Sequence, residues 1–158
     1  MTNTQIRRSD RHLVLVDIEN IAGTPTPSPD AVRVAIQKLE EIVPGFKSAQ
    51  KVWAFSHRAA RTVAFAAFPD RQLWRSGPDG ADRALLEVLD TERIEERYER
   101  VTVCSGDGIF ADSIARLAGH GVMVGVAARR GHVSTRLRMA TQHVTYLRET
   151  NSALGTAS

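Results

Sequence analysis

LVLVDIEN, at residues 13–20, and VTVCSGDG, at residues 101–108, each join an apolar run of β-type residues to an aspartate, Asp17 or Asp107. If the two runs are neighbouring parallel strands, both aspartates emerge at the carboxyl edge of one sheet, in the crevice where open α/β sheets bind ligands. Carboxylates gathered there repel one another, and a divalent metal ion commonly relieves the repulsion. The two stretches therefore predict an anionic site at the sheet edge.

Composition indicates one globular domain. The chain has 158 residues, of which 42% are hydrophobic and 25% charged, and no apolar run is long enough to cross a bilayer. Residues 1–11 lack the apolar core of a signal peptide, so we expect a cytoplasmic protein without a membrane segment. The formal net charge of +3 permits a polyanionic partner without requiring one. Cys104 is the only cysteine and is expected to be a buried apolar side chain.

Apolar runs alternate with helical patterns along the chain, which predicts βαβ units and a mainly parallel sheet. We expect a single three-layer α/β/α Rossmann-like domain at residues 11–147, between a polar tail at 1–10 and a flexible tail at 148–158. No helix is expected to begin at Asp17. The expected strands are 12–16, 51–55, 72–75, 101–104, 122–126 and 144–147, and the expected helices are 30–42, 59–67, a segment around 84–89, 110–117 and a short one from 134.

Further acids fall at the same edge of the expected sheet. Asp82 stands where the loop after the third strand meets a helix, and Asp112 lies one turn into the helix after Asp107. Mg²⁺ prefers oxygen ligands, and a site of this kind suits phosphodiester hydrolysis. Two structural alternatives stay open, because Asp107 could cap a helix and Asp82 could favour a helix amino terminus by its charge. Asn20 could cap a turn, or its amide could orient a water or a phosphate.

These motifs, taken in order along the chain, resemble the NYN domain, a branch of the PIN-like nucleases. The resemblance covers residues 11–147 and rests on Asp17-Ile18-Glu19-Asn20, on Gly80-Ala81-Asp82 before a helix, and on the turn Ser105-Gly106-Asp107-Gly108 with Phe110. It implies a PIN-like fold, endoribonuclease activity on RNA, and Mg²⁺ or Mn²⁺ held by aspartates. Carried over, the metal-binding and catalytic acids are Asp17, Asp82 and Asp107, and Asn20 is the polar residue after the first strand.

The chain departs from this family pattern at Ile109, where a second aspartate is common. Asp112 could substitute as a metal ligand if its side chain reached back over a turn. The departure leaves room for an altered metal site, or for a protein that binds RNA and cleaves it poorly.

A basic stretch follows the fifth expected strand. RNA binding needs cations for the phosphate backbone, and single strands often stack on aromatic or arginine side chains. A solvated basic loop is an equally weighted alternative, and we expect Trp53 and Trp74 to pack in the core. The candidate RNA-binding residues are Arg129, Arg130, His132, Ser134, Arg136 and Arg138.

The leading functional hypothesis is a metal-dependent endoribonuclease that hydrolyses RNA phosphodiester bonds at the aspartate cluster. The alternative is a non-catalytic RNA-binding or regulatory NYN module, which Ile109 supports. A phosphotransfer enzyme with Asp17 as nucleophile ranks third, because Glu19 stands where such enzymes typically have an aspartate. The oligomeric state is open, with a homodimer as one alternative.

Overall fold

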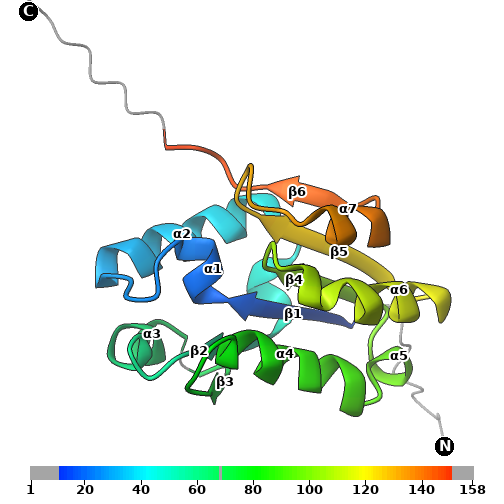
Figure 1. The fold of residues 1–158 in the computed structure, drawn as a ribbon, viewed down its shortest axis with the longest axis horizontal. Helices are drawn as coiled ribbons and strands as arrows, with labels where there is room; N and C mark the ends of the chain where they lie inside the picture. The colour runs from blue at the N-terminus through cyan, green and yellow to red at the C-terminus, as the bar shows by residue number, and fades with distance from the viewer. Residues whose placement is uncertain (1–10, 68, 151–158) are drawn as a thin grey trace, which may run out of the picture.

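A sheet of six parallel strands forms the centre of the molecule (Figure 1). The computed structural model describes residues 11–67 and 69–150. Every neighbouring pair of strands is parallel, and the order across the sheet is β3-β2-β1-β4-β5-β6. The strands are β1 (His12–Asp17), β2 (Gln50–Phe55), β3 (Arg71–Trp74), β4 (Arg100–Cys104), β5 (Met123–Ala128) and β6 (Val144–Tyr146).

Helices cover both faces of this sheet and complete the expected three-layer α/β/α arrangement. One face packs against α1 (Ile18–Ala22), α2 (Pro29–Ile42) and α3 (Ala60–Ala67). The other face packs against α4 (Gly80–Thr91), α5 (Ile94–Arg97), α6 (Ala111–Gly119) and α7 (Thr135–Ala140). The described residues also include two single-turn 3₁₀ helices, at Phe46–Ser48 and Gly108–Phe110.

β1 is the central strand of both hydrophobic cores. Leu13 and Leu15 point into the core beneath α4, whereas Val14 and Val16 point into the core beneath α2. All four side chains are almost fully buried, so the strand is apolar on both faces, as parallel strands between two helical layers are. Each such side chain contributes roughly 1.5–3 kcal/mol by leaving water. This burial fixes the register of β1 and thereby the position of Asp17.

The ends of several helices follow the sequence signals. Ser28 Oγ accepts from the backbone N–H of Ala31 at 3.1 Å, and Pro29 occupies the first turn of α2. Gly121, after α6, has a φ of 85°, the left-handed conformation that glycine adopts without steric penalty. Cys104 is fully buried, and burial raises the pKa of its thiol. The cap of α2 and the glycine after α6 are as expected, and the buried thiol excludes a reactive thiolate at Cys104.

The expectation that no helix begins at Asp17 was wrong. The five-residue helix α1 begins at Ile18, and Asp17 is its N-cap. A helix this short shows less than two turns of apolar periodicity, so the sequence pattern could not reveal it. Trp74 also differs from expectation, since its side chain is 53% exposed on the edge strand β3, whereas Trp53 is buried and its Nε1 donates to Asp70.

Residues 1–10 and 151–158, which include most of both expected tails, lie outside the described residues. Residues 148–150 are described and lie against α2, where Lys38 Nζ donates to Thr150 Oγ1 at 3.2 Å. None of the helices in the described ranges combines the length and apolarity of a membrane span.

The first residue of β1 makes stability sensitive to pH. His12 is buried, its Nε2 lies 2.8 Å from Thr102 Oγ1, and its Nδ1 is enclosed without a partner among the described residues. Burial, reinforced by Arg100 and Lys51, lowers the pKa of His12 from 6.5 to about 4. Between these values the unfolded chain binds a proton that the folded chain does not.

The free energy of unfolding should therefore contain a contribution from His12 that is present above pH 6.5 and is lost as the pH falls toward 4. Urea titrations across this range, on the wild type and on His12→Gln, measure it. The stability difference between the two proteins should change with pH over this window. A constant difference would contradict the buried neutral imidazole.

Candidate functional site

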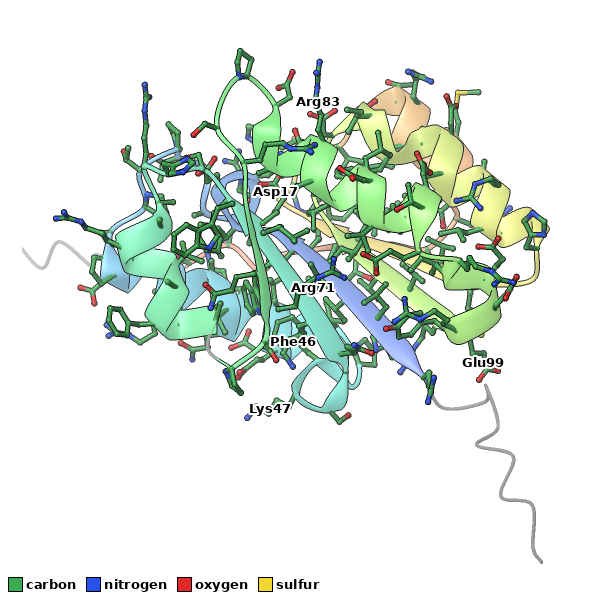
Figure 2. The ribbon with its side chains drawn as sticks, turned by 90° about the horizontal axis from the view of Figure 1, so that it is seen from below. Asp17, Phe46, Lys47, Arg71, Arg83 and Glu99 are labelled. Atoms are coloured by element: carbon green, nitrogen blue, oxygen red, sulfur yellow. The ribbon has the colours of Figure 1, made fainter. Side chains whose placement is uncertain are left out.

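The order of the strands creates a crevice at the carboxyl ends of β1 and β4. These two strands are neighbours, with Val16 opposite Cys104, yet the chain leaves β1 toward β2 and leaves β4 toward β5. The loops after them diverge, which opens the position where doubly wound sheets bind ligands. Figure 2 shows Asp17 at this end of β1, close to the first turn of α4, and Glu99 at the opposite end. The predicted convergence of Asp17 and Asp107 on one edge is confirmed.

Asp17 is held in place by contacts from two segments. Its carboxylate is 4% exposed and accepts from the backbone N–H of Asn20 at 3.2 Å and from Ser105 Oγ at 3.3 Å. Burial raises the pKa of Asp17, although hydrogen bonds from Asp82 and Asn20 act in the opposite direction. Asp17 therefore serves as a helix cap and also lies at the base of the crevice.

Asp82 enters the crevice from the first turn of α4. The close approach of this turn to β3 requires Gly80, since a Cβ there would lie 2.4 Å from the carbonyl oxygen of Arg75. Asp82 is 8% exposed, and its Oδ1 is enclosed with no hydrogen-bond partner in the described part of the chain. Burial, then Asp17, then Asp107 raise the pKa of Asp82 to about 9. At neutral pH Asp82 thus holds a proton in the absence of a cation.

Asp107 comes from the loop after β4. Its Oδ1 accepts from the backbone N–H of Ile109 at 2.9 Å, so it caps the 3₁₀ turn as one of the structural alternatives predicted. Its charge also raises the pKa of Asp82, which places it next to that carboxyl. Capping and membership of the acidic cluster are therefore compatible in Asp107. We refer to Asp17, Asp82 and Asp107 as the acidic cluster.

Asn20 links the loops after β1 and β4. Its Oδ1 accepts from the backbone N–H of Gly106 at 3.1 Å, which orients the amide. The Nδ2 group donates to none of the described residues. The carbonyl oxygen of Gly106 accepts from the backbone N–H of Ser134 at 2.9 Å, and a Cβ at Gly106 would lie 1.7 Å from the carbonyl oxygen of His132. Only glycine permits this contact between the loops after β4 and β5.

Asp112 does not join the acidic cluster. Its side chain is 91% exposed on the first turn of α6 and forms an ion pair with Arg136, at 3.2 Å between Nη2 and Oδ1. The groups that raise the pKa of Asp82 include Asp17 and Asp107 but not Asp112. Because this side chain is exposed and paired with Arg136, Asp112 does not substitute for the aspartate that Ile109 replaces.

The acidic cluster fits a hydrated divalent cation better than a closed cage. Within residues 11–67 and 69–150, no three His, Cys, Asp or Glu side chains already form a group that could hold a metal ion. The enclosed Oδ1 of Asp82, however, lacks the partner that a buried carboxylate oxygen needs. Mg²⁺ is typically held by one or two carboxylates and keeps several waters. Asp17 and Asp82, whose carboxyl groups interact directly, would hold such a cation.

The basic stretch divides into two parts. Arg129, Arg130 and His132 lie on the loop after β5, beside α1. Ser134 precedes α7 and its side chain makes no capping hydrogen bond, while Arg136 pairs with Asp112. Arg138 is exposed on α7. The first part thus lies beside α1, whereas Ser134 contacts the loop after β4 through Gly106.

Comparison with known proteins identifies the family. The NYN domain family matches residues 11–148, nearly the whole chain. The chain belongs to the NYN domain family. NYN domains are generally ribonucleases of the PIN-like superfamily, whose nucleases typically use divalent metal ions. The resemblance in the sequence motifs is confirmed.

The fold is also similar to that of a solved structure. A protein of unknown function from Vibrio parahaemolyticus matches with a TM-score of 0.58 and 16% sequence identity, over 88% of this chain and 93% of that chain. At this identity the similarity shows the fold alone. No curated protein matches the chain in sequence.

The raised pKa of Asp82 predicts an unusual dependence of stability on pH. The folded protein binds a proton between about pH 4 and pH 9 that the unfolded chain releases, so this group lowers the free energy of unfolding as the pH rises through that range. Asp82→Asn should therefore stabilise the metal-free protein at pH 8 and have little effect at pH 5. Thermal melts in EDTA at both values measure the difference.

Mg²⁺ or Mn²⁺ should raise the melting temperature of the wild type at pH 8 and affect Asp82→Asn much less, because a bound cation stabilises the folded state. Asp30→Asn, which removes an exposed carboxylate on α2, serves as the control. Equal responses in all three proteins would show that Asp82 binds no cation.

Proposed function

We propose that this protein is a metal-dependent endoribonuclease that hydrolyses RNA phosphodiester bonds at the acidic cluster, acting on RNA in the cytoplasm. The family supports a ribonuclease in general, and the acidic cluster supports metal dependence and the location of the site. The observation that carries the proposal is Asp82: a carboxyl is buried beside two others, with one oxygen left unpartnered. Burial of this kind is costly and is typical of functional sites.

The chain's own groups prepare the site for a phosphodiester. Ser105 Oγ and the N–H of Asn20 orient the carboxylate of Asp17, and the N–H of Gly106 orients the amide of Asn20. The free Nδ2 of Asn20 is then available to donate to a nonbridging phosphate oxygen. Because these groups are fixed before RNA binds, the reaction needs little reorganisation of the protein.

Asp17 and Asp82 would hold Mg²⁺ or Mn²⁺, which when bound polarises a phosphoryl oxygen and lowers the pKa of a coordinated water. Binding of the cation requires Asp82 to release its proton, which its pKa of about 9 opposes at low pH. Asp107 lies beside Asp82 and is able to orient or deprotonate the attacking water. Activity should therefore rise with pH through the neutral range.

The second candidate is a non-catalytic RNA-binding module. Ile109 removes the usual second aspartate, and Asp112 faces Arg136 rather than the acidic cluster. One fewer carboxylate weakens the attraction of the site for a divalent cation. In this alternative the protein keeps its fold and the basic loop after β5, and it binds RNA without cleaving it.

Cleavage of labelled single-stranded and hairpin RNA separates the two candidates. The wild type should cut RNA in Mg²⁺ or Mn²⁺ and stop in EDTA. Asp107→Asn should lower the rate on the order of 100-fold or more, because groups at a metal-assisted site stabilise transition-state charge by several kcal/mol.

The matched control is Asp112→Asn, which removes a carboxylate from the same segment outside the acidic cluster. It should cleave RNA at close to the wild-type rate, and both variants should melt within a few degrees of the wild type. RNA binding that persists in EDTA, with no cleavage in either metal, would favour the non-catalytic module.

A further inference from the structure

A second candidate site lies on the other side of α1 from the acidic cluster. A cavity of about 250 Å³ opens between α1, α2, the loop after β5 and the segment that follows β6. Figure 1 shows α1 beside α2, with the loop after β5 nearby. Asn20 connects the two sites, since its side chain belongs to the acidic crevice while its carbonyl oxygen accepts from Arg129 Nε at 3.0 Å. The cavity is thus next to the proposed catalytic site and separate from it.

The charge of this cavity is strongly positive. Its lining includes four permanent cations, one imidazole and a single acid, namely Lys38, Arg129, Arg130, Arg148, His132 and Glu149. None of these cations forms an ion pair within residues 11–67 and 69–150. Several arginines outside the cavity are paired, as Arg71 is with Glu92 and Arg93 with Glu96. An excess of cations over acids in a concave surface raises the local concentration of anions.

Two of the arginines are held before any ligand binds. Arg129 is half-buried, and its guanidinium packs over Gly23, where a Cβ would lie 2.6 Å from Nη1. Gly23, with a φ of 77°, both ends α1 and leaves this space. The guanidinium of Arg130 lies over the ring of Tyr146, 5.0 Å from its centroid. The Nη groups of both side chains donate to no described residue, so they are available to a ligand.

We infer that this cavity is a phosphate-binding pocket, which holds a phosphate group of RNA other than the one at the cleaved bond. Planar guanidinium groups bind phosphate oxygens in pairs, and fixed arginines lose little entropy in doing so. Four cations against one carboxylate suit an anion with more than one charge, such as a terminal phosphomonoester. The inference rests on RNA being the substrate, as proposed above, and adds where a second phosphate of that substrate is held.

Binding of a short fluorescent single-stranded RNA to the full chain in EDTA tests the pocket without cleavage. Three forms of the RNA are compared at one salt concentration: with a 5′-phosphate, with a 3′-phosphate, and with hydroxyls at both ends. Arg130→Gln and Arg148→Gln, two exposed positions, should each weaken binding about tenfold, the effect of losing one charge-assisted phosphate contact. Inorganic phosphate should compete with the RNA.

The control variant is Arg33→Gln, which removes an exposed arginine from α2 that pairs with Asp30. Tighter binding of one phosphorylated form supports the pocket and identifies the end group as its ligand. Equal binding of all three forms, weakened by Arg130→Gln and Arg148→Gln, supports the pocket with an internal phosphate as its ligand. Binding that these two variants leave at the Arg33→Gln level would overturn the inference.

This outcome is independent of the nuclease proposal. Because no metal is present and no bond is cleaved, an inactive acidic cluster would leave the affinities unchanged. Conversely, if the pocket binds no phosphate, the nuclease proposal still stands or falls with the cleavage assay on Asp107→Asn.

Discussion

The parallel pairing of β1 with β4 is the constraint on which the site depends. It brings Ser105 within hydrogen-bonding distance of Asp17, although the two residues are 88 positions apart in the sequence. It also places Asp107 nearby, in the loop after β4. The pairing is fixed by apolar burial, because β1 packs against helices on both faces and a shift of one residue would turn every side chain to the opposite core. The geometry of the acidic cluster is thus set by hydrophobic packing, not by the acids themselves, which repel one another.

The charged residues are arranged differently on the helical layer and at the carboxyl edge of the sheet. Around α4 and α5, arginines pair with nearby acids, as Arg71 and Arg97 do with Glu92, and these contacts satisfy the surface of the helical layer. At the carboxyl edge the charges are left unbalanced, with buried acids in the crevice and unpaired arginines beside α1. Unbalanced charge of this kind lowers the stability of the protein without ligands, so that binding a cation and an anion is favourable. The proposed metal ion and the RNA phosphodiester would supply that cation and that anion.

Close contacts between loops hold the acidic cluster and the neighbouring arginines in place. Gly80 lets α4 start against β3, and Gly106 lets the loop after β4 lie against His132. Asn20 contributes on both sides of α1, since its side chain accepts from Gly106 and its carbonyl oxygen accepts from Arg129. The short helix α1 therefore connects the acidic cluster to the proposed phosphate-binding pocket through Asn20. An RNA that spans both sites would contact groups that the fold already holds in fixed positions.

The sequence by itself determined the alternation of strands and helices, the parallel sheet and the edge at which Asp17, Asp82 and Asp107 meet, because these depend on periodic burial and on the direction in which strands end. The family was recognised separately, by the resemblance of the ordered motifs around these aspartates. It did not determine α1, which is too short for a periodic signal, or the exposure of Trp74, which follows from the place of β3 at the sheet edge. Only the tertiary structure separated Asp112 from the acidic cluster and grouped Lys38 and Arg148 with Arg129. Those outcomes depend on where side chains from distant segments point once the layers have packed, and no local pattern records that.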